Sequence, residues 1–77
     1  MHEKLRAFIT TELMRDPGYP LQDGEPLISG GLIDSFSLVE LQLFVDNEFG
    51  IRIEDTDLTA DSADNINDIV ALIETYL

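Results

Sequence analysis

Apolar residues recur every three or four positions in three stretches of the chain, which is the spacing of an amphipathic helix. The first stretch predicts a helix over residues 3–14, whose apolar stripe is formed by Leu5, Phe8, Ile9 and Leu13. Pro17 and Gly18 follow shortly afterwards and should end this helix.

The second stretch predicts a helix over residues 35–49 with two apolar stripes side by side. One stripe is formed by Leu38, Leu41, Val45 and Phe49. The other is formed by Phe36, Val39 and Leu43. Gly50 suits the left-handed conformation in which many helices end, so we expect the helix to close there.

A third helix should begin near Asn65, because asparagine is a good N-cap and Asp68 lies in the favourable first turn. Its core stripe is formed by Ile66, Ile69, Val70 and Ile73. Residues 55–59 are expected to form a short helical turn. Ile51 and Ile53 alternate with a polar residue, but the chain offers no second strand, so we expect a loop held by these two side chains.

Residues 16–34 form a long connection that holds all three prolines and four of the five glycines. Its apolar residues indicate that it packs across the helices: Leu21, Leu27, Ile28, Leu32 and Ile33. The pattern as a whole predicts an all-α fold, a small four-helix bundle of three main helices and a short third helix, with a long first loop. A chain of 77 residues has room for one domain, 1–77.

Charge narrows the choice of partners. Sixteen acidic residues against four basic ones give a net charge of −12, and residues 21–77 carry all of it. Nucleic acid is excluded as a partner because phosphate binding needs clustered lysine and arginine. A basic protein surface is the better candidate, attracted over a long range. The alternative is that acidity only keeps a small protein soluble.

The composition also excludes several classes of protein. The chain has no cysteine, so it has neither disulfides nor a zinc–cysteine site. No apolar run approaches the roughly 20 residues of a membrane span, and the first residues lack the apolar stretch of a signal peptide. We therefore expect a soluble, cytoplasmic monomer.

Ser35 stands where the long loop ends and the second helix begins. An ordinary role at a helix start explains most such serines, and Asp34, or Ser37 together with Glu40, could provide the cap. An exposed hydroxyl there also lies where free N–H groups and the helix dipole favour a phosphate. A hydrolytic serine needs a neighbouring base, and the single histidine is His2, far along the chain. We therefore expect a protein without catalytic residues.

Four segments of the chain together resemble the acyl carrier and peptidyl carrier protein family, over about residues 27–76. They are Asp34-Ser35-Phe36 with the following Leu38-Val39-Glu40-Leu41, then Glu48-Phe49-Gly50-Ile51-Arg52-Ile53, Asp57-Leu58-Thr59, and Asn65-Ile66 with Ile69. The resemblance implies that Ser35 receives 4′-phosphopantetheine from coenzyme A through a phosphopantetheinyl transferase, which makes the chain a phosphoprotein. It implies that the arm holds acyl or aminoacyl groups as thioesters.

The same resemblance implies partner enzymes with basic docking surfaces: loading enzymes, synthases or transferases of fatty-acid, polyketide or nonribosomal-peptide biosynthesis. Asp34 would be the acidic residue of the attachment motif. The partner surface would be formed by Phe36, Val39, Glu40, Leu43, Asp46, Glu48, Asp55 and Asp57. For Val39 and Leu43, extra core or contact with the cargo is an equal alternative. Phe36, Asn47 and Glu54 depart from the family pattern and favour a discrete carrier of a specialised pathway.

Two other hypotheses stay open. The first is an acidic helical adaptor that binds partners without a prosthetic group. The second is a calcium-binding module, since a calcium loop starting at Asp55 would place acidic residues at suitable positions. That loop has Ala60 where glycine is needed and Ile66 where glutamate is needed, so we expect no metal site.

Overall fold

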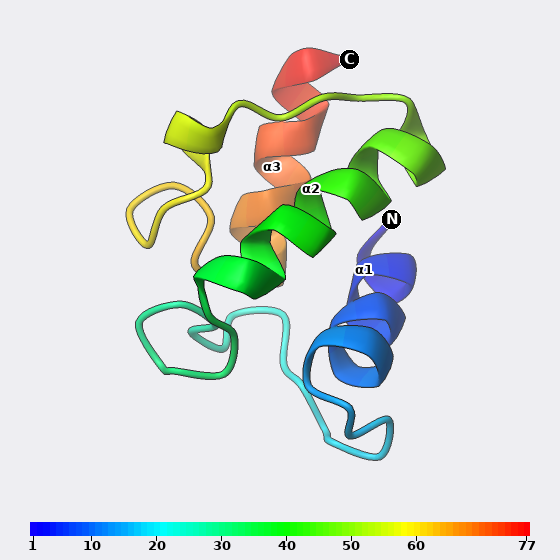
Figure 1. Cartoon of the computed structure of the whole chain (residues 1–77), viewed down its shortest axis with the longest axis vertical. Helices are drawn as coiled ribbons and strands as arrows, with labels where there is room; N and C mark the ends of the chain where they lie inside the picture. The colour runs from blue at the N-terminus through cyan, green and yellow to red at the C-terminus, as the bar shows by residue number, and fades with distance from the viewer.

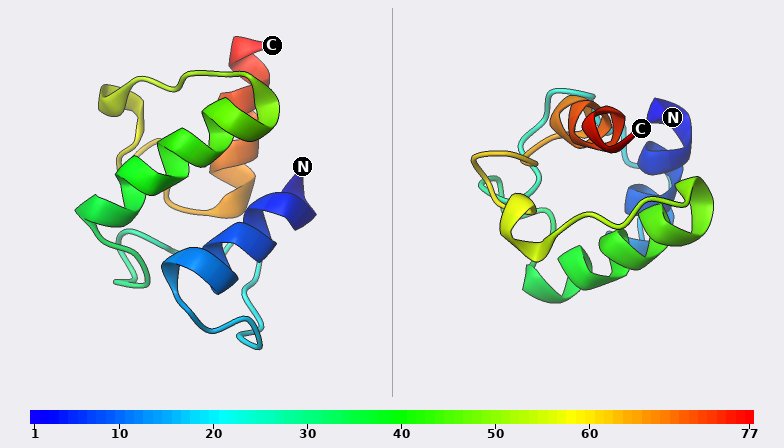
Figure 2. Two further views of the ribbon diagram at one scale, coloured as in Figure 1. Left: turned by 45° about the vertical axis from the view of Figure 1, so that its right-hand side comes forward. Right: turned by 90° about the horizontal axis from the view of Figure 1, so that it is seen from above.

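The computed structural model describes the backbone of residues 1–77 and every side chain except that of Asp55. The chain begins with α1 (His2–Phe8), which runs directly into a π-helix, η1 (Ile9–Leu13). The other segments are α2 (Ser35–Phe49), a 3₁₀ turn η2 (Asp55–Asp57) and α3 (Ile66–Tyr76). Figure 1 shows α2 lying across α3, with α1 beside them, and Figure 2 shows the three helices around a shared interior.

The all-α prediction is confirmed, but the prediction of four helices is not. The described residues form three α-helices and no strand, and the helical turn expected over residues 55–59 is the 3₁₀ turn η2, which is too short to be a fourth helix of the bundle. The turn stays short because it has few apolar anchors: among the described side chains between Glu54 and Asn65, the buried ones are those of Leu58 and Ala63. Two such residues cannot form the stripe that a packed helix needs.

The first helical segment covers nearly the predicted range of 3–14, but its second half is a π-helix that the sequence did not predict. Leu5 and Ile9 of its stripe are fully buried, as expected. The Thr10 hydroxyl donates to the carbonyl of Arg6 at 2.8 Å, and such back-bonding competes with the regular ladder. The backbone amide of Met14 then donates to the Ile9 carbonyl, five residues back, at 2.8 Å.

The predicted limits of α2 are confirmed at both ends. At its start the Asp34 carboxylate accepts the backbone amide of Ser37 at 2.9 Å, so Asp34 is the N-cap. The Ser37 hydroxyl also hydrogen-bonds with Asp34, at 3.0 Å, instead of capping the helix itself. At the other end Gly50 has the left-handed φ of 69°.

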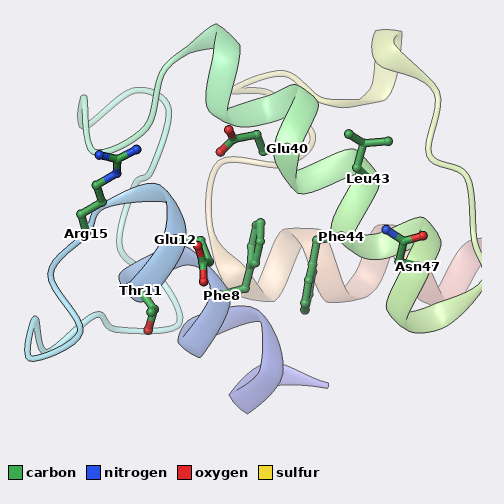
Figure 3. Close-up of a pocket in the computed structure, with 8 residues that line it drawn as sticks. All are labelled: Phe8, Thr11, Glu12, Arg15, Glu40, Leu43, Phe44 and Asn47. Atoms are coloured by element: carbon green, nitrogen blue, oxygen red, sulfur yellow. The ribbon is translucent and has the colours of Figure 1, made fainter.

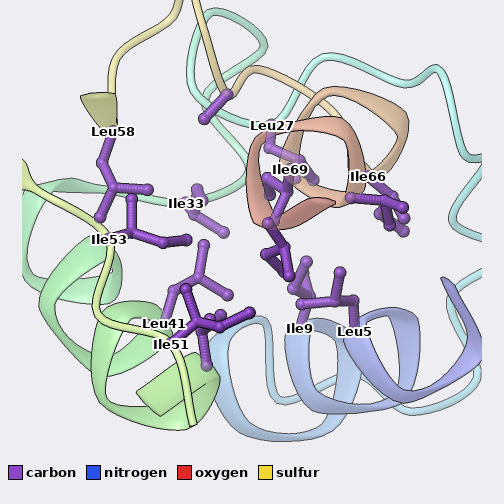
Figure 4. Packing of buried hydrophobic residues seen from close by; sticks show 14 of the residues in the cluster. Leu5, Ile9, Leu27, Ile33, Leu41, Ile51, Ile53, Leu58, Ile66 and Ile69 are labelled. Atoms are coloured by element: carbon purple, nitrogen blue, oxygen red, sulfur yellow. The ribbon is translucent and has the colours of Figure 1, made fainter. Parts of the chain in front are cut away.

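The start of α3 is confirmed as well, because the Asn65 side chain accepts the Asp68 amide at 2.7 Å. One hydrophobic core joins the helices and the loops, and Figure 4 shows their side chains pointing into the same interior. Ile51 and Ile53 are buried in it without forming a strand, as predicted. The fully buried larger side chains are Leu5, Ile9, Leu27, Leu41, Val45, Ile53, Ile66, Ile69 and Ile73.

The long first loop is fixed to the rest of the molecule, as its apolar residues predicted. Leu21, Leu27 and Ile33 are buried in the core. Asp64 holds the loop from the other side, because its carboxylate accepts the backbone amides of Ile28 at 2.9 Å and Ser29 at 2.8 Å. The Ser29 hydroxyl donates to it at 2.5 Å. These hydrogen bonds, first the one from the Ser29 hydroxyl, lower the pKa of Asp64 below its usual value.

Candidate functional site

Ser35 is the first residue of α2, and its side chain is exposed. Asp34 beside it is occupied as the helix cap. The backbone amide of Ser37 and then its hydroxyl stabilise the carboxylate form and lower the pKa of Asp34. The structure therefore offers an accessible hydroxyl at the positive end of a 15-residue helix, next to a carboxylate that stays ionised.

The single histidine is placed away from this serine. The Nε2 atom of His2 lies 3.0 Å from Oδ1 of Asn67, so His2 joins the start of α1 to α3. Among the described residues, no group of three or more histidine or acidic side chains converges in a way that could hold a metal ion. None of the described helices has the length and apolar character needed to cross a bilayer.

The second apolar stripe of α2 faces solvent. The exposed fraction is 84% for Phe36, 56% for Val39 and 58% for Leu43. The alternative that Val39 and Leu43 are extra core is therefore wrong. Glu40 and Asp46 are exposed on the same side of the helix, at helical spacings from these three residues. We call this surface the outer face of α2: Phe36, Val39, Glu40, Leu43 and Asp46.

The structure places the other predicted partner residues elsewhere. Glu48 is turned toward α1 and forms an ion pair with Lys4 at 2.8 Å. Asp57 accepts a hydrogen bond from the Tyr76 hydroxyl at 2.7 Å, which joins η2 to the end of α3. The side chain of Asp55 lies outside the described part of the structure.

A groove that the sequence did not indicate lies between the first helical segment and α2, with a volume of about 660 Å³ (Figure 3). Its lining from the first segment is Phe8, Thr11, Glu12 and Arg15, and its lining from α2 is Glu40, Leu43, Phe44 and Asn47. The rings of Phe8 and Phe44 are stacked, with centroids 4.2 Å apart and planes 12° apart. Phe44 belongs to neither apolar stripe of α2. In the sequence, only this position outside the two stripes indicates that Phe44 packs against a neighbouring segment.

Comparisons with known proteins include a likeness to a solved structure. No family model matches the chain, and no curated protein matches it. A solved chain described as "Crystal structure of FAD-dependent dehydrogenase" matches it with a TM-score of 0.76 and 28% sequence identity. The match covers 88% of this chain and 96% of that one, so the two chains have nearly the same length.

These comparisons contradict the identification with the carrier protein family. No carrier family model or curated carrier protein matches, and the solved chain it resembles is described as an FAD-dependent dehydrogenase. The predicted role in carrying acyl or aminoacyl thioesters is therefore corrected as well. The physical reason is that its motifs have local explanations: Asp34 caps a helix, Gly50 ends one, and the apolar spacing is common to small helical proteins.

Proposed function

We propose that this chain is a non-catalytic docking module that works with a flavin-dependent dehydrogenase through the outer face of α2. The single observation that carries the proposal is the exposure of Phe36, Val39 and Leu43 as one apolar stripe bordered by carboxylates. Large exposed apolar residues that share one face favour a protein contact. The charge of −12 favours a partner whose docking surface is basic.

The likeness to the dehydrogenase structure supports the choice of partner. Dinucleotide cofactors such as FAD are commonly held at the edge of a parallel sheet, on a turn between a strand and a helix. The described part of this chain has no strand. A small helical chain of this length is better suited to bind a flavin enzyme than to form its cofactor domain, and we place the flavin chemistry in the partner.

The test is affinity capture from the source cells with the purified chain as bait, followed by identification of the bound proteins and measurement of released FAD. The double variant Val39→Asp/Leu43→Asp places two charges on the outer face. Ala71→Asp/Thr75→Asp is the matched control, because it adds the same two charges at exposed positions of α3. We expect an FAD-bearing dehydrogenase with the wild type and the control, and at least a tenfold loss with the double variant.

The captured dehydrogenase is then purified and titrated with each variant by calorimetry. Direct binding that the double variant loses, while its melting curve stays like that of the wild type, supports the docking module. Absence of any flavoprotein from the capture, or binding that is equal for all variants, would overturn the proposal.

The attachment of 4′-phosphopantetheine to Ser35 remains a prediction, and we propose it as a modification of the docking module. The exposed hydroxyl at the start of α2 fits this group, because its phosphate would join the Ser35 oxygen where the helix dipole favours negative charge. The group would supply a thiol, which the chain itself lacks. A phosphopantetheinyl transferase would be the second partner.

This modification is tested by intact mass after incubation with coenzyme A and a broad-specificity phosphopantetheinyl transferase. We expect a mass gain of one phosphopantetheine in the wild type and in Ser62→Ala, whose serine is also exposed, and no gain in Ser35→Ala. An unchanged mass of the wild type, or a gain that survives Ser35→Ala, would contradict it.

A further inference from the structure

The groove between the first helical segment and α2 has an aromatic floor that is firmly held. Phe44 is stacked on Phe8 and also meets the edge of Phe49, with centroids 6.1 Å apart and planes at 89°. Both rings of the stacked pair are partly exposed at the groove. The parts of the rings that the stack leaves open at the groove offer an apolar surface on which the stem of a long side chain packs.

Two carboxylates line this groove, one from each of its walls. Figure 3 shows Glu12 coming from η1 and Glu40 from α2. Among the described side chains the ion pairs are Lys4–Glu48 and Arg6–Asp23, so neither groove carboxylate takes part in one. Two like charges across a groove repel each other, and a cation placed between them removes that repulsion.

The wall of the groove that belongs to the first helical segment has an unusual backbone conformation. Thr11 and Glu12 belong to the π-helix η1, which is a rare conformation that occurs frequently at functional sites. The groove also continues directly into the outer face of α2, because Glu40 and Leu43 belong to both. A partner docked on the outer face would therefore reach into the groove.

We propose that this groove receives a basic side chain, an arginine or a lysine, from the partner that docks on the outer face of α2. The inference rests on the proposed docking function and adds a specific contact to it. The stem of the basic side chain lies along Phe8 and Phe44, and its charged end lies between Glu12 and Glu40. Arg15 also borders the groove, and among the described side chains it forms no ion pair with either carboxylate.

The first test needs no partner protein. The ¹⁵N-labelled chain is titrated with N-acetyl-arginine amide, and in parallel with the uncharged N-acetyl-norleucine amide, while amide chemical shifts are recorded. We expect saturable shifts confined to the groove with the arginine compound. Glu12→Gln/Glu40→Gln should raise its dissociation constant about three- to fivefold. The control Glu3→Gln/Glu74→Gln, which removes two exposed acids outside the groove, should change it much less.

Three outcomes of this titration would overturn the inference. They are shifts spread evenly over the chain, equal binding of the norleucine compound, and an equal loss in the control variant, which would show long-range attraction alone. The variants' melting curves, compared with that of the wild type, establish that each is folded.

The second test separates this inference from the proposed function. The captured dehydrogenase is titrated with Glu12→Gln, which leaves the outer face of α2 unchanged, and with Glu74→Gln as control. A weakening of about three- to fivefold with Glu12→Gln alone supports the contact. If wild type binds while Glu12→Gln equals Glu74→Gln, the groove inference fails and the docking function stands. If no dehydrogenase binds, the docking function fails, and the arginine titration still decides whether the groove binds a basic group.

Discussion

The two faces of α2 have nearly the same apolar content and opposite environments. On the inner face Leu41 and Val45 are fully buried, whereas on the outer face Phe36, Val39 and Leu43 are mostly exposed. The inner face meets the loops and the other helices, and no described segment of the chain covers the outer face. The two apolar stripes of α2 therefore differ in role. The inner stripe stabilises the fold, and the outer stripe is available to another molecule.

The largest expected effect compares two leucines that lie two positions apart. Leu41→Ala removes a fully buried side chain and should lower the free energy of unfolding by about 2–5 kcal/mol. Leu43→Ala removes one that is 58% exposed and should change it by less than about 0.5 kcal/mol. Urea denaturation measures both. Similar losses for the two variants would show that the outer stripe contributes to the core.

The sequence predicted the limits of α2 and the start of α3 because their signals are local. Asp34 and Asn65 cap the starts of helices and Gly50 ends one, and each does so through residues close to it in the chain. The order of residues is therefore enough to predict these helix ends. Periodicity also predicted two stripes on α2, but it could not tell which one is covered, because both have helical spacing. That distinction depends on where the loops and α3 pack.

The groove could not be predicted for the same reason. It depends on Phe8 stacking on Phe44, from segments far apart in the chain, and on a π-helix that no apolar pattern encodes. The family assignment was wrong because no family model or curated protein supports it and the solved chain that this chain resembles is described as a dehydrogenase. Short motifs at helix ends recur in unrelated helical proteins, so their agreement along the chain described local structure and did not establish a function.

Substitution of Phe36 should have the opposite consequences to substitution of Leu41. It should weaken binding of the partner strongly and hardly change the stability of the fold. Its ring is 84% exposed, and exposed aromatic residues at the centre of a contact often contribute most of the affinity. Phe36→Ala should weaken binding of the captured dehydrogenase about tenfold or more and leave the melting temperature nearly unchanged. Calorimetry and thermal melting measure the two effects. A melting temperature lowered as far as that of Leu41→Ala would show that Phe36 packs on the protein itself.

Asp64 holds the loop that leads into α2, through hydrogen bonds from Ile28 and Ser29. Its pKa is lowered in the folded chain, first by the Ser29 hydroxyl, so its stabilising effect is present above the pKa of the unfolded chain, about 3.9. The effect is lost as pH falls through the lower folded value. Asp64→Asn should therefore melt a few degrees below the wild type at neutral pH, and the gap should close at strongly acidic pH. A gap of the same size at both would contradict this assignment.

The smallest expected effect compares two glutamates on the two sides of α2. Glu48 is paired with Lys4 at 2.8 Å, whereas Glu40 on the outer face adds to the repulsion within a chain of net charge −12. Glu40→Gln and Glu48→Gln remove the same charge, but only the second also removes an attraction. At low salt Glu40→Gln should therefore melt at a slightly higher temperature than Glu48→Gln. At about 1 M salt, where the screening length falls to roughly 3 Å, the difference should shrink. A difference that persists unchanged at high salt would mean that packing, and not charge, distinguishes these two positions.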